Sequence, residues 1–596
     1  MATRNSFIIS RGFRNYFIFS ILFSVAEQLC ATVDMILVGN FVGPDAFAAL
    51  NLVIPVENLT NGFLMLFTGG AGIISSRLIG DQDFNRAYKA LTASTILATA
   101  VMAVASIICL ASLDSIVRAL CSDASLTQYL TDYLKIYFAG LVPTYLFFQA
   151  TLIINIDGKP HVSLATMLIA CALDLLLDSV LMGYLGMGVK GLGIATIASY
   201  ILPLAILVPY INHKCSFRYI WAGEDTTELL SQNIKFGIPY CLPYAVSCLI
   251  TFIANTLILN NLGNEILYVW STGYQVFSIV IMAMSCIGGT ILVIMGSMLV
   301  GCHDMDGLKI LTKKCMTVTA LVVGGLVLIV LVFPHFILSI FGDKEVESVE
   351  NADTWIRCIA ISCIPYAICC IKVYLSQALD RSFSSVLSLM VLLTLDIAAL
   401  CIFAWADPDR MYLALPLAGA TFIIADFIIC RIITLRRKDL SRYLLIPHQD
   451  DVKSKYISIP YNQAGMDNAI RELSSFLESC EMSPVLCSGV NLCCEEIMLS
   501  IIQNNAENKG EGYFFDISVL DDENEVKVTV KDAGFPFNPV RKYTKSAAEA
   551  FEAGEDLDLS LRIINKLCKE LTYNYMYGQN TIYMAFVKDS EGLSKA

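Results

Sequence analysis

Long apolar runs occupy most of the first 437 residues of this chain. Each run has roughly 20 residues or more, which is enough for a helix to cross a hydrocarbon core of ~30 Å. The chain has 596 residues, of which 56% are hydrophobic and only 16% are charged. Soluble domains have about a quarter of their residues charged. The sequence therefore predicts an all-α polytopic membrane protein.

The apolar runs and the polar breaks between them give twelve candidate transmembrane helices. These are centred near residues 25, 58, 100, 144, 173, 201, 247, 283, 322, 366, 394 and 423. The composition changes after Lys438, where charged residues become frequent and apolar runs become short. Such a change marks a domain boundary. We therefore expect a membrane region followed by a water-soluble tail.

Basic residues gather in loops on one side of the predicted helices. They are Arg4, Arg11, Arg14, Arg77, Arg86, Lys89, Lys159, Lys214, Arg218, Lys309, Lys313, Lys314, Arg381, Arg431, Arg436, Arg437 and Lys438. Loops rich in Lys and Arg face the cytoplasm. Both ends of the membrane region are then cytoplasmic, which requires an even number of spans. We expect a multi-pass protein of the plasma membrane.

The two halves of the membrane region resemble each other at a period of about 220 residues. The stretch LVPTYLFFQATLIINIDGKP matches CIPYAICCIKVYLSQALDRS, so that Pro143 corresponds to Pro365. This repeat predicts two six-helix bundles, an N-terminal lobe (residues 1–220) and a C-terminal lobe (residues 221–440). Internal repeats around a central site are typical of alternating-access carriers.

Several segments resemble the multidrug and toxic-compound extrusion (MATE) family. They are VDMILVGNFVGPDAFAALNLVIPV, GGAGIISSRLIG, INIDGKPHVSLA and GMGVKGLGIATIASY, and the resemblance covers roughly residues 10 to 440. It implies a secondary antiporter rather than an enzyme. Such a protein exports small organic compounds, often cationic, in exchange for Na⁺ or H⁺.

Three carboxylates lie inside predicted spans of the N-terminal lobe. Asp34 is late in the first span, and Asp174 and Asp178 share one face of the fifth because they are four residues apart. A charge inside a span costs a few kcal/mol, so it suggests a function. The family has an Asp in span 1 and Asn-x-x-x-Asp in span 5, and Asp174 replaces that Asn. The three residues are the predicted coupling site, for Na⁺ or H⁺, and no other metal is expected.

The C-terminal lobe has fewer charges at the corresponding positions. Asn255 corresponds to Asp34, Leu400 corresponds to Asp178, and Asp396 is the remaining carboxylate. Further polar groups that could face the central cavity are Glu27, Gln28, Glu57 and Asn58. The alternative is a structural role, for example as a helix cap at Asp34 or as a packing residue at Asp426.

After a linker (residues 441–454), residues 455–596 form a predicted cytoplasmic tail domain. Its pattern contains alternating strands, two amphipathic helices and the hairpin YFFDISVLDDENEVKVTVKDAG, which predicts an α+β sandwich. The order of elements resembles the histidine kinase/Hsp90-like ATPase fold, particularly its anti-sigma-factor serine kinase branch.

The first two motifs of that ATPase family are partly present. Glu496 matches the Glu that activates the reacting group, but Ser500 stands in place of the Asn that holds Mg²⁺. Asp532 and Gly534 match the Asp-x-Gly motif, whose Asp accepts a hydrogen bond from the adenine amino group.

The third motif is a Gly-rich turn that receives phosphate oxygens at a helix N-terminus. This chain has Glu555, Asp556 and Asp558 at the corresponding turn. Carboxylates repel a triphosphate, and their side chains block the close approach that Gly permits. The sequence therefore predicts a regulatory domain of this fold without catalysis, and places both ATP–Mg²⁺ binding and kinase activity in doubt.

Two other functions fit the same pattern. A membrane-bound sensor would use the tail as a serine kinase or to bind a regulatory protein, and a lipid-linked precursor flippase would have similar spans. The net charge of −13 argues against nucleic acid as a partner.

Overall fold

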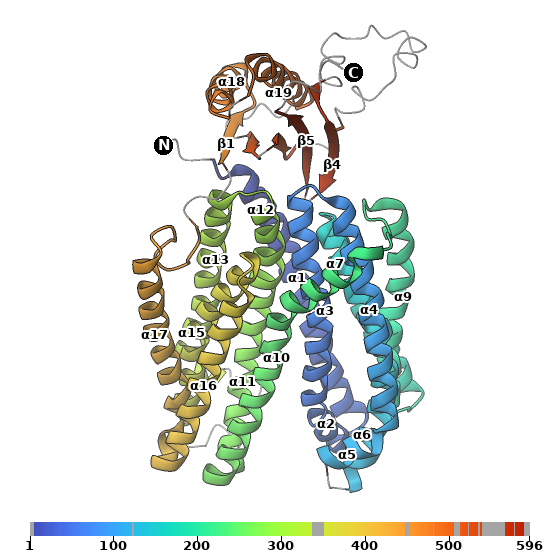
Figure 1. Ribbon diagram of the computed structural model, residues 1–596. Helices are drawn as coiled ribbons and strands as arrows, with labels where there is room; N and C mark the ends of the chain where they lie inside the picture. The colour runs from blue at the N-terminus through green and yellow to red at the C-terminus, as the bar shows by residue number, and fades with distance from the viewer. Residues whose placement is uncertain are drawn as a thin grey trace.

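The computed structural model shows a bundle of long helices with a small mixed domain at one end (Figure 1). The structure describes residues 5–121, 124–336, 351–447, 453–480, 482–505, 513–522, 524–534, 537–538, 567–576 and 578–588. We call the end of the bundle that carries the tail domain the tail end.

The N-terminal lobe contains six spans. They are α1 (Phe7–Phe41), α3 (Ile54–Gly80), α4 (Phe84–Ala111), the pair α6 (Ala124–Ala139) and α7 (Leu141–Ile156), α8 (Pro160–Asp178) extended by the π-helix η1 (Ser179–Tyr184), and α9 (Val189–Lys214). Short helices α2 (Pro44–Asn51) and α5 (Leu113–Leu120) lie at the end of the bundle opposite the tail (Figure 1). The pair α6 and α7 counts as one span with a bend of 50°.

The C-terminal lobe repeats this arrangement. Its spans are α10 (Thr226–Leu262), α11 (Asn264–Met284) continuing through η3 (Ser285–Met295) into α12 (Gly296–Gly301), α13 (Met305–Val332), α15 (Ala352–Ala378), α16 (Ser382–Ala406) and α17 (Ala414–Arg436). The predicted twelve-helix membrane fold is confirmed for the described residues. A further helix of sufficient length and hydropathy, α19 (Pro484–Asn504), belongs to the core of the tail domain.

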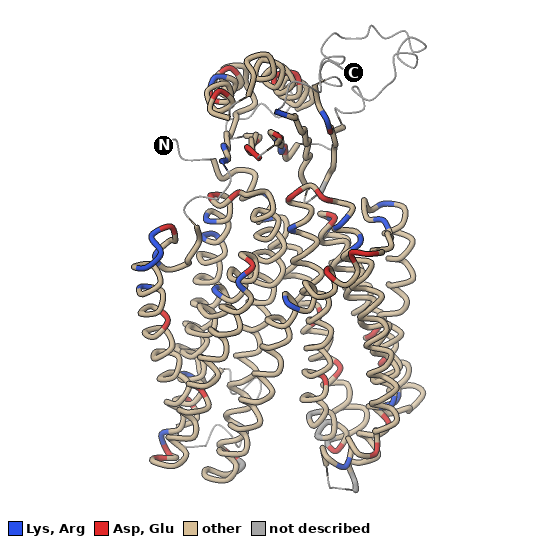
Figure 2. The backbone as a smooth tube through the Cα atoms, viewed as in Figure 1, with Lys and Arg blue, Asp and Glu red and all other residues tan. Residues whose placement is uncertain are grey.

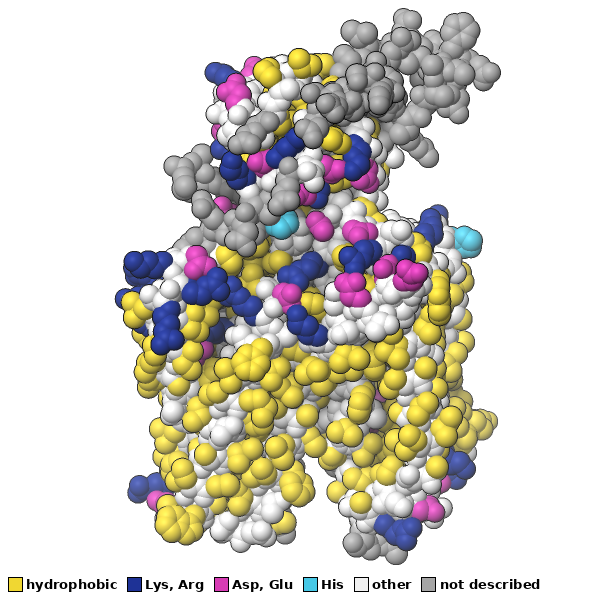
Figure 3. Space-filling model, viewed as in Figure 1, with side chains coloured by type: hydrophobic (Ala, Val, Ile, Leu, Met, Phe, Trp, Pro, Cys, Tyr) yellow, Lys and Arg dark blue, Asp and Glu magenta, His cyan; other side chains and the backbone are white. Residues whose placement is uncertain are grey.

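The surface of the bundle explains why these segments form helices. On the face shown in Figure 3, a broad hydrophobic belt covers the bundle. Large apolar side chains such as Leu321, Trp405 and Phe427 are exposed. In lipid, every backbone polar group must be bonded internally, and a helix achieves this within one segment.

The two lobes meet at the tail end and separate at the opposite end (Figure 3). At the tail end, α3 of the N-terminal lobe packs against α10 and α12 of the C-terminal lobe. A Cβ atom on Gly80 would lie 2.2 Å from the Met298 carbonyl oxygen, and one on Gly301 would lie 2.1 Å from that of Arg77. Glycine at both positions therefore allows the two backbones to touch. We call this contact the seam.

The tail domain is an antiparallel sheet covered on one face by two helices (Figure 1). The strands are β1 (Lys453–Pro460), β2 (Phe514–Asp521), β3 (Glu525–Asp532), β4 (Glu570–Met576) and β5 (Gln579–Val587), in the order β1-β2-β3-β5-β4. The helices are α18 (Gln463–Glu478) and α19. Alternate residues Val526, Val528 and Val530 of β3 are buried against the helices. The predicted α+β sandwich and its hairpin are confirmed.

Candidate functional site

The predicted coupling residues lie where α1 packs along α8. The Cys30 thiol on α1 donates a hydrogen bond of 3.1 Å to Oδ2 of Asp174 on α8. The Cys30 sulfur and one carboxylate oxygen from each of Asp34 and Asp174 all lie within 4.8 Å of one another. The two helices therefore bring together groups that are about 140 residues apart in the sequence.

The third carboxylate completes the cluster. Asp178 is the last residue of α8, and the backbone changes to the π-helix η1 directly after it. Such local π segments occur frequently at functional sites. Asp34 lies close to both Asp174 and Asp178, so a proton on Asp34 can be shared with either of them. We call Asp34, Asp174 and Asp178 the carboxylate cluster.

The carboxylate cluster retains unused acceptors. Asp174 is 3% exposed and Asp178 is 0% exposed. Within the described ranges, no hydrogen bond reaches Oδ1 of Asp174 or either carboxylate oxygen of Asp178. A buried carboxylate without partners is costly, and a bound proton or cation removes that cost. The arrangement can therefore hold H⁺ or a metal ion, and whether it does so stays a prediction.

Two thiols join the cluster that the sequence analysis did not identify. Cys30 is one helical turn before Asp34, and Cys171 is three residues before Asp174, so both spacings indicate a shared helix face. The Cys171 thiol donates to the Ala26 carbonyl at 3.4 Å and lies within reach of Cys30. Thiolates prefer softer cations than the oxygen ligands around them do.

The predicted cavity residues of the N-terminal lobe are less closely grouped. Gln28 is exposed, whereas Glu27, Glu57 and Asn58 are half-buried. Glu57, in the first turn of α3, accepts a hydrogen bond of 2.9 Å from the Tyr133 hydroxyl. Glu57 thus has a protein partner, whereas no described residue donates a hydrogen bond to the oxygens of Asp178.

The C-terminal lobe contains a different arrangement of charge. Lys372 on α15 lies 2.5 Å from both carboxylate oxygens of Asp426 on α17, and its ammonium also lies 3.0 Å from the Cys430 sulfur. Both charged side chains are at least 90% buried. The pair gives Asp426 the structural role considered from sequence. Lys372 itself was missed, although a lone Lys in an apolar run is a recognisable signal.

The two predicted cavity residues of the C-terminal lobe lie on other helices. Asp396 is buried on α16. Asn255 lies on α10, and its side-chain oxygen has no hydrogen-bond partner among the described residues. Their roles stay predictions.

In the tail domain, the motif residue Asp532 is surrounded by hydrogen-bond donors from its own chain. Oδ1 accepts hydrogen bonds from the Tyr461 hydroxyl and from the Gly534 amide at 3.1 Å. Oδ2 accepts from Asn580 at 2.9 Å and from Asn505 at 3.4 Å. Burial, together with the negative charge of Asp532, raises the pKa of Tyr461. A carboxylate offers about four lone-pair sites, so these donors occupy the acceptor that adenine would need.

Asn505 also fills the space beside the glycine of this motif. A Cβ atom on Gly534 would lie 2.0 Å from the Asn505 side-chain oxygen. A larger residue at this position would therefore displace the Asn505 side chain. Ser500 and Glu496 are half-buried on α19, and the turn from Glu555 to Asp558 lies outside the described residues.

Two known families match this chain, one in the membrane region and one in the tail domain. Residues 20–180 and 238–403 match the MatE family, which is more than half of the chain. Residues 459–586 match the histidine kinase-like ATPase domain.

Two curated proteins are similar to the membrane region. The multidrug export protein MepA of Staphylococcus haemolyticus is 25% identical over 244 residues, which are 40% of this chain and 54% of MepA. The probable multidrug resistance protein YoeA of Bacillus subtilis is 24% identical over 335 residues, which are 54% of this chain and 71% of YoeA. The chain thus matches only about half of the length of MepA.

Solved structures share the fold of the membrane region. An outward-facing multidrug resistance MATE family transporter of the MOP superfamily superposes with a TM-score of 0.65 at 16% identity, covering 72% of this chain and 96% of that chain. A MOP superfamily transporter from Pyrococcus furiosus gives a TM-score of 0.67 at 16% identity, covering 73% and 98%. With the family match, these findings show that the chain belongs to the MATE family and carries a C-terminal histidine kinase-like ATPase domain.

Proposed function

We propose that the protein is a secondary antiporter that exports small organic compounds, with cations as the principal class, in exchange for Na⁺ or H⁺. The carboxylate cluster is the observation that supports this most directly. Three carboxyl groups share one buried site, and the oxygens of Asp178 have no donor within the described residues. A group of this kind changes its charge when an ion arrives or leaves, as ion coupling requires.

The orientation follows from charge. Basic residues are concentrated at the tail end of the helical bundle (Figure 2). The tail end is therefore the cytoplasmic end in this proposal. The opposite end, where the lobes separate, then faces outward, and the tail domain lies in the cytoplasm.

The ion site acts by neutralising charge. An ion that enters from the outside removes the repulsion among Asp34, Asp174 and Asp178 and so permits α1 and α8 to remain packed while the lobes rearrange. Release of the ion on the cytoplasmic side restores that repulsion. The names of MepA and YoeA support multidrug compounds as the exported class.

Reconstitution of the full chain in liposomes tests the proposal. Flux of the fluorescent organic cation ethidium is measured under an imposed Na⁺ gradient, an imposed pH gradient, or neither. We expect flux against the ethidium gradient under one of the two ion gradients, which also identifies the ion. Equal passive flux under all three conditions would contradict an antiporter.

We infer that the tail domain regulates the carrier and does not catalyse phosphoryl transfer. Ser500 supplies no amide oxygen where the family has its Mg²⁺-binding Asn, and Asp532 is occupied by Tyr461, Gly534, Asn505 and Asn580. Calorimetric titration of the full chain with ATP and Mg²⁺ tests this inference. We expect no saturable heat at millimolar nucleotide, whereas tight Mg²⁺-dependent binding would favour the sensor kinase instead.

A further inference from the structure

The tail domain contacts the membrane region through the face of its sheet that the helices leave open. The strand register places one polar row across all five strands: Ser458, Asp516, Lys531, Thr581 and Asn574. Side chains alternate between the two faces of a strand. In β3 the buried residues face α18 and α19, and Lys531 therefore faces the membrane region.

One set of contacts reaches the C-terminal lobe. The turn after α12 contains Cys302, whose carbonyl accepts a hydrogen bond from the Tyr456 hydroxyl of β1. The Lys531 ammonium lies 3.0 Å from the Cys302 sulfur. Two strands of the tail domain thus bind a single turn of this lobe.

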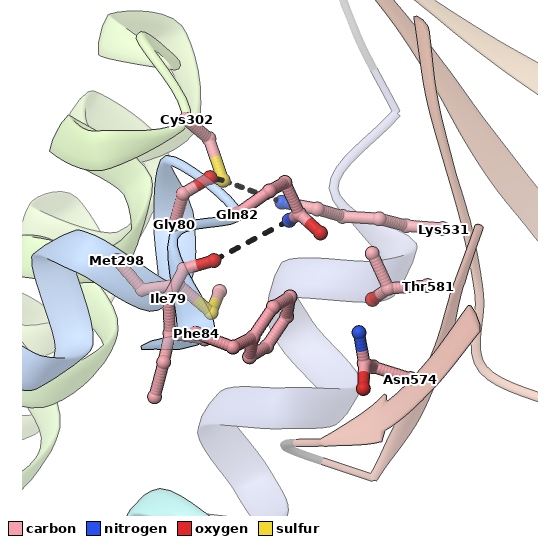
Figure 4. A pocket seen from close by; sticks show the side chains of 9 residues that line it. All are labelled: Ile79, Gly80, Gln82, Phe84, Met298, Cys302, Lys531, Asn574 and Thr581. Atoms are coloured by element: carbon pink, nitrogen blue, oxygen red, sulfur yellow. Dashed lines mark hydrogen bonds between the residues drawn. The ribbon is translucent and has the colours of Figure 1, made fainter. Parts of the chain in front are cut away.

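A second set reaches the N-terminal lobe. Asn574 and Thr581 line a small pocket with Gln82 of the turn between α3 and α4 and with Ile79 and Phe84 of the flanking helices (Figure 4). Cys302, Gly80, Met298 and Lys531 line the same pocket, which therefore spans both lobes and the tail.

Two further observations place the tail domain next to the N-terminal lobe. The Phe7 ring of α1 lies 5.2 Å from the Tyr513 ring. Burial raises the pKa of Asp81, and the nearby charge of Lys527 acts in the opposite direction. Asp81 directly follows α3, so Lys527 of the sheet lies close to the same turn.

The two bound turns correspond to each other in the internal repeat. Gln82 has φ of 64° and His303 has φ of 56°, and each is followed by an Asp that caps the next helix. Both turns lie at the seam, where Gly80 and Gly301 bring the lobes into backbone contact.

We propose that the tail domain is a latch that binds the equivalent turns of both lobes and holds the seam closed. This inference rests on the proposed carrier function, since opening the cytoplasmic side requires the α3 and α12 turns to separate. A rigid sheet that is bound to both turns cannot move with both of them when they separate. The tail domain must release one lobe before the carrier can open on the side of the tail domain. A ligand or protein that detaches the sheet from a lobe therefore accelerates this opening.

The strength of a single hydrogen bond between the sheet and a lobe sets the expected change in the closed-to-open equilibrium. A side-chain hydrogen bond stabilises by about 0.5–1.5 kcal/mol, so removing one shifts the closed-to-open equilibrium about two- to tenfold. Amide hydrogen exchange in a locally opening segment changes by the same factor.

Hydrogen exchange with mass spectrometry on the full chain in lipid nanodiscs tests the latch. The variants are Tyr456→Phe, which removes one hydroxyl, and Lys531→Glu, which reverses the charge beside Cys302. We expect exchange to rise about two- to tenfold in peptides from both turns, residues 77–87 and 298–308. Lys455→Glu is the matched control, because Lys455 of β1 pairs with Glu472 on the helix-covered side of the sheet.

Each outcome decides the proposal. Faster exchange in both turns, with α19 unchanged, supports the latch. Exchange that is unchanged, or that rises only in residues 298–308, overturns it because the sheet would not bridge the lobes. If Lys531→Glu also raises exchange in α19, the substitution has disturbed the tail domain itself. The result with Tyr456→Phe then decides the proposal. The exchange measurement does not depend on transport. An absence of gradient-driven ethidium flux would therefore reject the carrier function without changing the exchange result for the latch.

Discussion

The two lobes share one fold but treat buried charge in opposite ways. In the N-terminal lobe, Asp34, Asp174 and Asp178 lie close together. Three of their carboxylate oxygens accept no hydrogen bond from any described residue. In the C-terminal lobe, Asp426 is neutralised by Lys372 at 2.5 Å. A carboxylate with a fixed cation is a structural element, whereas one without a partner can exchange ions. In the proposed antiporter, this contrast predicts ion coupling in the N-terminal lobe and a stabilising role for the pair in the C-terminal lobe.

The largest effect is expected from breaking the C-terminal pair. Lys372→Met leaves Asp426 buried without a counter-charge, which destabilises the fold by about 3–5 kcal/mol. Thermal unfolding of the purified protein in detergent measures the loss as a lower melting temperature.

The control replaces both partners of that pair. Lys372→Met combined with Asp426→Leu removes both charges and fills the site with apolar groups, so we expect stability within about 1 kcal/mol of the wild type or above it. A double variant as unstable as the single one would mean that the pair contributes more than mutual neutralisation, and the contrast between the lobes would weaken.

A smaller effect, on transport rather than stability, is expected at the centre of the carboxylate cluster. Asp34 adjoins both Asp174 and Asp178, so Asp34→Asn removes the group that joins the site. We expect gradient-driven ethidium flux to fall about 10- to 100-fold. Asp45→Asn, at an exposed carboxylate of α2, should leave the flux at the wild-type level. Equal losses in both variants would indicate a general charge effect.

The thiols of the N-terminal lobe give a still smaller and chemically distinct effect. Cd²⁺ prefers sulfur ligands, so it should compete with the coupling ion beside Cys30 and inhibit ethidium flux. Cys30→Ser should raise the half-inhibitory Cd²⁺ concentration about tenfold. Cys248→Ser, on α10 of the other lobe, is the control. If Cys248→Ser protected equally, Cd²⁺ would be acting elsewhere.

Much of the fold was predictable from the sequence because it depends on local patterns. Apolar length located the spans, the internal repeat divided them into two lobes, and alternation located the strands of the tail domain. The bend between α6 and α7 was not predicted. It occurs at Gly140, where a Cβ atom would lie 2.3 Å from the Ile197 side chain of α9, and only the packed structure reveals that contact.

The candidate site was predictable only in part. The spacing of Asp174 and Asp178 indicated a shared helix face, but spacing cannot show which helix lies opposite, so Cys30 was missed. The same reason applies to Asp532. Its motif indicated an adenine-binding group, whereas Tyr461 and Asn505, from distant segments, bind it in the structure.

The most direct test of the account compares carboxylates of the two lobes in the ethidium flux assay. Asp174→Asn with Asp178→Asn is compared with Asp396→Asn, which changes a buried carboxylate of the C-terminal lobe. We predict that the double variant loses gradient-driven flux while Asp396→Asn retains at least about half of it. Undiminished flux in the double variant, or loss only in Asp396→Asn, would contradict ion coupling in the N-terminal lobe.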